Sequence, residues 1–332
     1  MPTLNKAKKE TQIIFKWGGI AIGIIFLFLL GIRFLTFVKE SLTPPPPPQA
    51  SFGKLTPIPF PNQLQENITY SLDTLTGYLP NFSNQTKVYK IITDPPTLLG
   101  LQKTREKVAQ IGFNTQETKI AEDVYQWTDQ DPGLQRRITI NIYSSDFTIS
   151  SPFLAGSSLQ TLISSAEKDN SIEIARSFLV DMALFPADID ENKTKISNSG
   201  TKIIRVDFFQ KDLDGLPIYY EKGISSNIDL LLGKENNELK VVNATYFHKN
   251  ISQISSTYAI KSATQAFSEL QKGKGYIAHK NERVVEVTIK EVFLGYYIGE
   301  LEQEFLMPII VFIGDNDFVG YVSAVTDEWI SN

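Results

Sequence analysis

The chain has 332 residues, a formal net charge of −5 and no cysteine, so its stability must come from a hydrophobic core and not from disulfides. Residues 1–40 hold six of the 32 basic but only two of the 37 acidic side chains, which leaves the remainder with a net charge of −9. This balance argues against binding to nucleic acid and against adhesion to anionic lipid.

The first predicted element is a helix from Gly18 to Val38, which is apolar or glycine at nearly every position. Its 21 residues reach about 30 Å as a helix, the thickness of the hydrocarbon core of a bilayer. We therefore predict a basic tail at residues 1–16 and a transmembrane helix at residues 17–38. Through this helix the chain would bind the lipid bilayer as a single-pass protein.

Four lysines precede this span against one acid, so the positive-inside rule places the N-terminus in the cytoplasm and the rest of the chain outside. A bacterial cytoplasmic membrane suits a cysteine-free exported chain better than the eukaryotic secretory route. The alternative is a cleaved signal peptide. We favour a signal anchor because the apolar run exceeds the roughly 7–15 residues of a signal-peptide core and no A-x-A site follows it.

Residues 39–61 are rich in proline, with Pro44–Pro48 unbroken and Pro57, Pro59 and Pro61 at every second position. Proline fixes φ and removes a hydrogen-bond donor, which predicts a stiff polyproline II spacer that holds the next domain off the membrane. A ligand for proline-reading domains is the alternative, and we favour it less because most such domains are intracellular.

The remaining 271 residues contain three predicted amphipathic helices, each of which should bury one side against a sheet. The apolar spacing places them at Leu98–Ile111, Ile172–Phe185 and Ile260–Gln271. Before the second helix, Asn170 and Glu173 have the spacing of a capping box.

Strands fill most of the sequence between these helices. In the N-terminal half they are predicted at Val88–Ile92, Asp123–Thr128 and Arg137–Tyr143. In the C-terminal half three hairpins are predicted, Lys202–Gln210 with Leu216–Tyr220, Ile224–Leu232 with Leu239–Phe247, and Ile309–Ile313 with Phe318–Val322, beside a long run at Val284–Tyr297. Pro308 should then lie at the start of its strand or on an edge.

Hairpins with interposed helices predict an α+β fold with mainly antiparallel sheets. A stretch rich in serine near residues 150–165 predicts a boundary between two subdomains. The N-terminal one would span residues 62–158 and the C-terminal one residues 159–332.

Few residues suit catalysis or metal binding. Two histidines and no cysteine exclude thiol catalysis and argue against a zinc site, so no metal site and no cofactor are predicted. Asp212 with Asp214, and Asp315 with Asp317, have the D-x-D pattern of a calcium loop. Each pair lies in a predicted turn, where aspartate is favoured for its own backbone hydrogen bonds.

Adjacent aromatic residues in the predicted strands suggest binding. In a strand, neighbouring side chains point to opposite faces of the sheet, so one face can take the helices while the other needs cover. The cover would come from a neighbouring domain, a second copy of the chain or a partner. Packing within the chain and an exposed binding surface both remain open. The candidate binding residues are Phe208, Tyr219, Tyr220, Tyr296 and Tyr297.

The segment IIRVDFFQKDLDGLPIYYEKGISSNIDLLLGKENNELKVVNATY, with its turn at Gly215 and Pro217, resembles the hairpin pair of PepSY and thermolysin-propeptide modules. The helix KSATQAFSELQKGKGYI and the strands VFLGYY, FLMPIIVFIG and FVGYVSAV are similar to the closing elements of such modules and of YycI-type regulators of a cell-wall-sensing kinase. The resemblance covers about residues 170–325. It implies a non-catalytic extracytoplasmic module that inhibits, chaperones or senses.

We therefore expect a membrane-anchored, non-catalytic binding protein that modulates another envelope protein, such as a sensor kinase or a peptidase, alone or as a homo-oligomer. The alternative is an envelope hydrolase that cleaves peptidoglycan or glycan with a carboxylate pair. A cleft with two unpaired carboxylates would favour the hydrolase, whereas a shallow aromatic groove or an open sheet edge would favour the binding protein.

Overall fold

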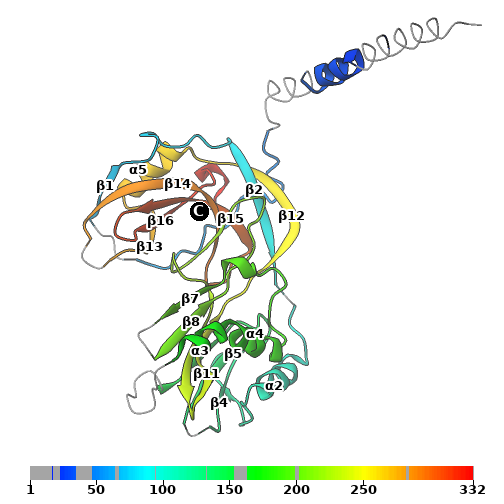
Figure 1. Ribbon diagram of the computed structural model, residues 1–332, viewed down its shortest axis with the longest axis vertical. Helices are drawn as coiled ribbons and strands as arrows, with labels where there is room; N and C mark the ends of the chain where they lie inside the picture. Colours follow the sequence, from blue (N-terminus) through cyan, green and yellow to red (C-terminus); the bar gives the residue numbers. More distant parts are fainter. Residues whose placement is uncertain are drawn as a thin grey trace, which may run out of the picture. The chain divides into compact units, whose positions relative to one another are not determined.

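The computed structural model describes residues 17, 23–34, 47–63, 67–93, 95–131, 133–152, 163–198, 202–281 and 284–331. The chain divides into two compact units, Met1–Pro47 and Pro48–Asn332. The second unit contains two eight-stranded sheets, each at the centre of one lobe (Figure 1). We call the lobe that is built from the middle of the chain the central lobe. The other lobe holds both ends of this unit, and we call it the terminal lobe.

In the first unit, residues 23–34 form a helix with exposed side chains. The whole predicted basic tail at residues 1–16 lies outside the described residues. So do residues 18–22 and 35–38 of the span predicted at residues 17–38, and residues 39–46 of the predicted spacer. Within the described part of the chain, no helix has both the length and the apolar character needed to cross a bilayer. The transmembrane helix at residues 17–38 stays a prediction.

The sheet of the central lobe has the order β3-β4-β5-β6-β11-β10-β8-β7. Its first half consists of a helix and four strands, namely α2 (Gly100–Gln110), β3 (Thr118–Lys119), β4 (Val124–Thr128), β5 (Arg137–Asn141) and β6 (Phe147–Ser150). Its second half repeats that order with α4 (Ser171–Asp181), β7 (Lys195–Asn198), β8 (Ile203–Asp207), β10 (Ile228–Glu235) and β11 (Glu238–Tyr246). The last strands of the halves, β6 and β11, pair antiparallel, so the strand order is symmetric about their junction.

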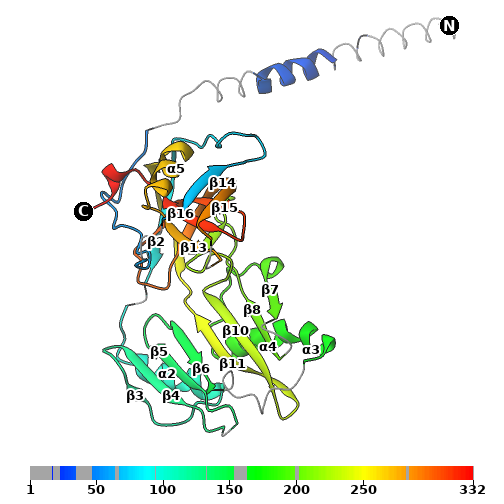
Figure 2. The ribbon, with the colours of Figure 1, turned by 90° about the vertical axis from the view of Figure 1, so that its left-hand side faces the viewer.

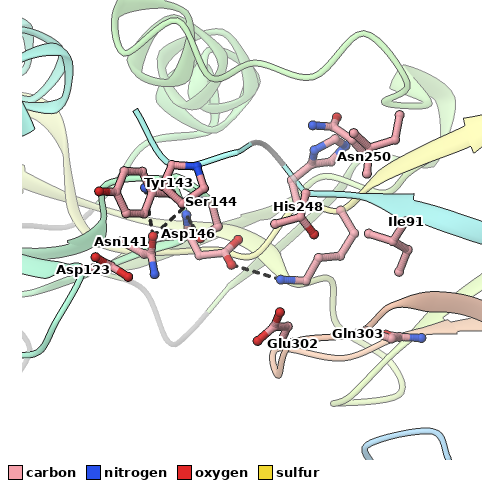
Figure 3. A pocket seen from close by; sticks show the side chains of 14 residues that line it. Ile91, Asp123, Asn141, Tyr143, Ser144, Asp146, His248, Asn250, Glu302 and Gln303 are labelled. Carbon is pink, nitrogen blue, oxygen red and sulfur yellow. Dashed lines mark hydrogen bonds and ion pairs between the residues drawn. The ribbon is translucent and has the colours of Figure 1, made fainter. Parts of the chain in front are cut away.

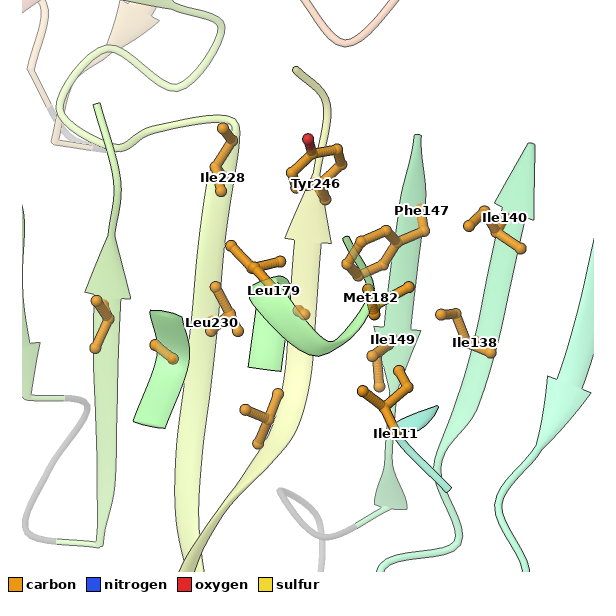
Figure 4. Packing of buried hydrophobic residues seen from close by; sticks show 14 of the residues in the cluster. Ile111, Ile138, Ile140, Phe147, Ile149, Leu179, Met182, Ile228, Leu230 and Tyr246 are labelled. Atoms are coloured by element: carbon orange, nitrogen blue, oxygen red, sulfur yellow. The ribbon is translucent and has the colours of Figure 1, made fainter. Parts of the chain in front are cut away.

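Helices cover one face of this sheet (Figures 2 and 4). Leu179 and Met182 from the α4 region pack against strand residues such as Ile149 and Leu230, and all four are buried. Burying one such side chain stabilises the fold by roughly 1.5–3 kcal/mol. The short helix α3 (Ser165–Asp169) precedes α4 on the same face.

The terminal lobe is built around two long strands, β14 (Glu286–Ile298) and β15 (Phe305–Gly314), which pair antiparallel. The other strands of its sheet are β1 (Thr69–Leu72), β2 (Gln85–Ile92), β9 (Ile218–Tyr220), β12 (Asn250–Ala259), β13 (Tyr276–His279) and β16 (Val319–Ser323). Helix α5 (Ala263–Gln271) packs against β16. The α+β class with mainly antiparallel sheets is thus confirmed, although β1 and β9 join β14 in parallel.

The three predicted helices are present with shifted ends. The second begins without the predicted capping box, because Asn170 makes no side-chain cap hydrogen bond and has helical φ and ψ of −88° and −5° between α3 and α4. A capping box does occur at α5, where Ser262 and Gln265 exchange side-chain and backbone hydrogen bonds. The sequence analysis did not identify that box.

Two of the three predicted hairpins are confirmed, β10 with β11 and β15 with β16. The third is wrong. Its turn forms, with a mutual backbone pair between Leu213 and Leu216 and positive φ at Asp214 and Gly215. However, β8 pairs with β7 and β10 in the central lobe, whereas β9 joins β14 in the terminal lobe.

Pro308 is inside β15 and not at its start. On one side of the strand, the neighbour changes here from β2, which pairs at Leu306, to β16, which pairs at Ile309. The Pro308 carbonyl accepts from Ala324 on that side, just past the end of β16. The missing N–H of proline therefore falls at a break in the ladder, where it costs little.

The predicted boundary at residues 158 and 159 does not separate the lobes, since strands on both sides of it share the sheet of the central lobe. Residues 49–61, predicted as the end of a spacer, also belong to the fold; we call them the strap. Leu55 is fully buried, and its N–H donates to the Trp329 carbonyl at 2.8 Å while its carbonyl accepts from the Ser331 N–H at 2.8 Å. The strap thus packs on the terminal lobe beside the C-terminal tail.

Candidate functional site

The aromatic residues predicted as a binding surface lie almost entirely in the interior. Phe208, Tyr220, Tyr296 and Tyr297 are 2, 2, 0 and 0% exposed, and Tyr219 is half-buried. Burial raises the pKa of Tyr219 to about 12. Four of these rings therefore form no exposed surface in this structure, whereas Tyr219 is partly exposed. The buried rings pack within the chain, which is the other alternative that the sequence left open.

Structural partners are present for three aspartates of the D-x-D patterns. Asp212 pairs with Lys193, and Asp214 lies 2.9 Å from Lys87. Asp315 accepts a hydrogen bond from a backbone N–H of β14 at 2.9 Å. Among the residues that the structure describes, no group of three histidine, aspartate or glutamate side chains could hold a metal ion.

A cleft of about 440 Å³ lies where the turn after β5, the ends of β2 and β11 and the loop between β14 and β15 meet (Figure 3). Its charged lining comes from Asp123 and Asp146 of the central lobe, His248 and Lys249 after β11, and Glu302 of the β14–β15 loop. Strand ends and turns supply every one of these side chains, as expected for a site carried on connections between rigid elements. This cleft is our candidate functional site.

An ion pair lies at the centre of the cleft. Lys249 Nζ is 3.0 Å from Asp146 Oδ2, and the two side chains are 10 and 14% exposed. The other carboxylate oxygen of Asp146 is buried and accepts no hydrogen bond from the residues that the structure describes. Burial raises the pKa of the Asp146 carboxyl, although the charge and hydrogen bond of Lys249 oppose this. The site thus holds a carboxylate with one unused acceptor.

His248 is engaged in a second network beside that pair. Its Nε2 is 2.9 Å from Asp188 Oδ1, while Gln210 Nε2 donates to Asp188 Oδ2 at 2.7 Å. Burial by itself would raise the pKa of Asp188, but its hydrogen bonds with His248 and Gln210 lower the pKa overall. This histidine is therefore positioned by a structural carboxylate.

Apolar side chains are exposed next to the polar lining. Ile92 lines the cleft and is half-exposed, and Leu301 directly precedes the lining residue Glu302. Farther along the same connection, past the lining residue Pro96, Leu99 is exposed and Leu98 is 106% exposed. An exposed apolar group of this kind beside a polar cleft is typical of a surface that contacts a protein. We call Ile92, Leu98 and Leu99 the apolar rim.

A carboxylate pair lies elsewhere, across strands β8 and β10. Asp207 and Asp229 are directly opposite each other in the ladder and are 5 and 4% exposed. Arg205 bridges them, with Nε 2.9 Å from Asp207 and Nη2 3.1 Å from Asp229. Burial raises the pKa of Asp229 to about 6, with Arg205 opposing and Asp207 adding to the rise. Neither carboxylate lines the cleft.

The sequence analysis missed both groups. Asp207 and Asp229 fall inside predicted strands, where aspartate is depleted, and that anomaly was a usable signal. Asp146 and Lys249 are 103 positions apart and sit in connections, so no local pattern links them.

Comparison with known proteins does not identify a family for this chain. No protein-family model and no curated protein matches the sequence. An uncharacterized protein from Eubacterium rectale is similar at 14% identity and a TM-score of 0.39, over 74% of this chain and 85% of that one. The C-terminal domain of Bacillus megaterium YpeB is similar at 15% identity and a TM-score of 0.33, over 71% of this chain and 95% of that one. These likenesses do not assign a family, and the resemblance to PepSY modules stays a prediction.

Proposed function

We propose that the chain is a membrane-anchored, non-catalytic protein of the bacterial envelope, which binds a segment of another envelope protein at the cleft and so modulates it. The observation that carries this proposal is the apolar rim beside the polar cleft. Three apolar side chains exposed along one short connection lose solvent contact only when something covers them, and burial of each is favourable.

The charges of the cleft indicate the chemistry of the bound segment. Asp123 and Glu302 add two carboxylates to the Asp146–Lys249 pair, so the lining is acidic overall. A partner segment that combines apolar side chains with a lysine or arginine would match both the rim and the cleft. The same contacts favour binding over hydrolysis, because Asp146 is neutralised by Lys249 and His248 is held by Asp188.

Substitution in the apolar rim tests this function. Leu98→Asp should lower recovery of the partner protein after crosslinking in intact cells by at least tenfold, since loss of a hot-spot side chain costs about 2 kcal/mol or more. Leu75→Asp is the matched control, because Leu75 is equally exposed at 103% but lies between β1 and β2, outside the connection that carries the apolar rim. Equal losses from both variants, or from neither, would count against the cleft as the binding site.

Anchoring in a membrane is supported by the apolar sequence from Gly18 to Val38 and by the exposed helical side chains of residues 23–34. We expect the full chain to stay in the membrane fraction after carbonate extraction, because about 20 apolar residues suffice to span a bilayer. Replacing Ile25 and Leu29 together with arginine should release it, since each central charge disfavours insertion by about 2.5–3.5 kcal/mol. Release of the unaltered chain by carbonate would contradict anchoring.

A further inference from the structure

The strap fills an aromatic groove on the terminal lobe. Phe60 stacks on Tyr276, with ring centroids 5.1 Å apart and an interplanar angle of 7°, and meets Tyr297 edge-on at 4.8 Å. Phe52 lies 5.2 Å from Phe305. Between these two rings Leu55 is fully buried. The side chains that cover the buried tyrosines thus come from the segment that follows the proline run.

Backbone hydrogen bonds fix the strap along its length. They are Ala50 N–H to the Thr257 carbonyl at 3.0 Å, Ser51 N–H to Ser256 Oγ at 2.8 Å, Phe52 N–H to the Tyr258 hydroxyl at 3.0 Å and Leu55 N–H to the Trp329 carbonyl at 2.8 Å. Pro57 and Pro59 follow, and neither has an N–H that needs a partner. An extended segment interrupted by proline suits such a groove, as in the aromatic grooves that recognise polyproline II peptides.

The floor of the groove is held together without the strap. Tyr276, Tyr297 and Tyr321 contact one another with ring centroids 5.9 to 6.4 Å apart, and they belong to strands β13, β14 and β16 of one sheet. The Tyr276 and Tyr321 hydroxyls donate to the carbonyls of Glu221 and Tyr220. Strand pairing and these bonds therefore define the site before any segment occupies it.

The strap is also bounded by exposed chain. Gln49 is exposed at its start and Asn62 at its end, while Lys54 and Thr56 face solvent on its outer side. Gln63 is tied to the Ile277 backbone by two hydrogen bonds just past the strap. The strap can therefore leave its seat as one segment once the two hydrogen bonds between Gln63 and Ile277 break.

We propose that this groove is a binding site for an extended, proline-interrupted segment, and that the strap of a second copy of this chain exchanges into it. The argument is that an exchanged strap repeats every contact of the strap that it replaces. Only the two hydrogen bonds of Gln63 and the entropy of association then decide between the closed monomer and the exchanged dimer, which is the usual route to domain swapping. The site would make the chain a homodimer partner through its own N-terminal segment.

Two single-cysteine variants of the full chain test the exchange, since the natural chain has no cysteine to interfere. One copy carries Gln49→Cys and one tag, and the other carries Thr257→Cys and a second tag. In the structure Gln49 N is 3.0 Å from Thr257 Oγ1, so a short bismaleimide should join the two copies when the strap of one lies on the other. The double variant Gln49→Cys/Thr257→Cys in one chain calibrates the reaction.

Random collision is measured by pairing Gln49→Cys with Ser197→Cys, an exposed position on the edge strand β7. Exchange predicts that the copy carrying Thr257→Cys is linked several-fold more than the copy carrying Ser197→Cys, and that adding Leu55→Asp to the strap removes the difference. Three outcomes would each overturn the proposal. The first is crosslinking inside single chains of the double variant with none between copies. The others are equal crosslinking of the two pairs of copies, and no crosslinking of the double variant at all.

Discussion

Replacing Leu55 with alanine should lower the free energy of unfolding by about 2–5 kcal/mol, the usual cost of deleting a buried leucine side chain. The expectation follows from its position in the strap, where the side chain is fully buried and both backbone groups pair with the C-terminal tail. A spacer residue in solvent would have no such effect. Denaturant unfolding of the full chain, with the slope checked for two-state behaviour, measures the change.

Leu75→Ala is the control for this experiment. It deletes the same atoms from a leucine that is 103% exposed, so its effect should stay within about 0.5 kcal/mol. If the two variants were equally stable, the strap would be a spacer and the sequence-based prediction for residues 39–61 would be correct after all.

Asp229→Asn should change the way in which stability depends on pH. Burial raises the pKa of Asp229 from 3.8 to about 6, with Arg205 opposing and Asp207 reinforcing the rise. Between these values the folded state binds more protons than the unfolded state, so this residue's contribution to stability falls as pH rises from about 4 to about 7. The gap corresponds to roughly 3 kcal/mol. The asparagine variant lacks this loss. Its free energy of unfolding, measured at both ends of the interval, should therefore rise relative to that of the parent by roughly 3 kcal/mol as pH increases.

A carboxylate with the opposite shift provides the sign control. Hydrogen bonds from Lys234 and Ser164 lower the pKa of Glu167 to about 2. Its contribution to stability is present above its ordinary value of 4.5 and is lost as pH falls toward 2. Glu167→Gln should therefore lose stability relative to the parent as pH rises through that interval. Parallel pH profiles for the Asp229→Asn variant and the parent would show that the buried pair carries no proton.

The sequence predicted only part of the environment of the paired aromatic residues. Their alternation in predicted strands showed that both faces of a sheet needed cover. It could not show that Phe52 and Phe60, more than 200 positions before their partners on β12 to β15, supply part of it. The prolines predicted a spacer because their effect on φ is local. The burial of Leu55, by contrast, depends on residues from the other end of the chain.

The sequence by itself determined the elements whose causes are local. The asparagines at positions 236 and 237 adopt positive φ in the turn between β10 and β11, and the amphipathic spacing of α2, α4 and α5 placed each helix. Only the tertiary structure decided which strands meet. In that structure β9 pairs with β14 and β6 pairs with β11. These pairings place Asp146 Oδ2 3.0 Å from Lys249 Nζ. Such pairings depend on burial and register summed over the whole fold, and a local period of two or 3.6 residues carries no information about them.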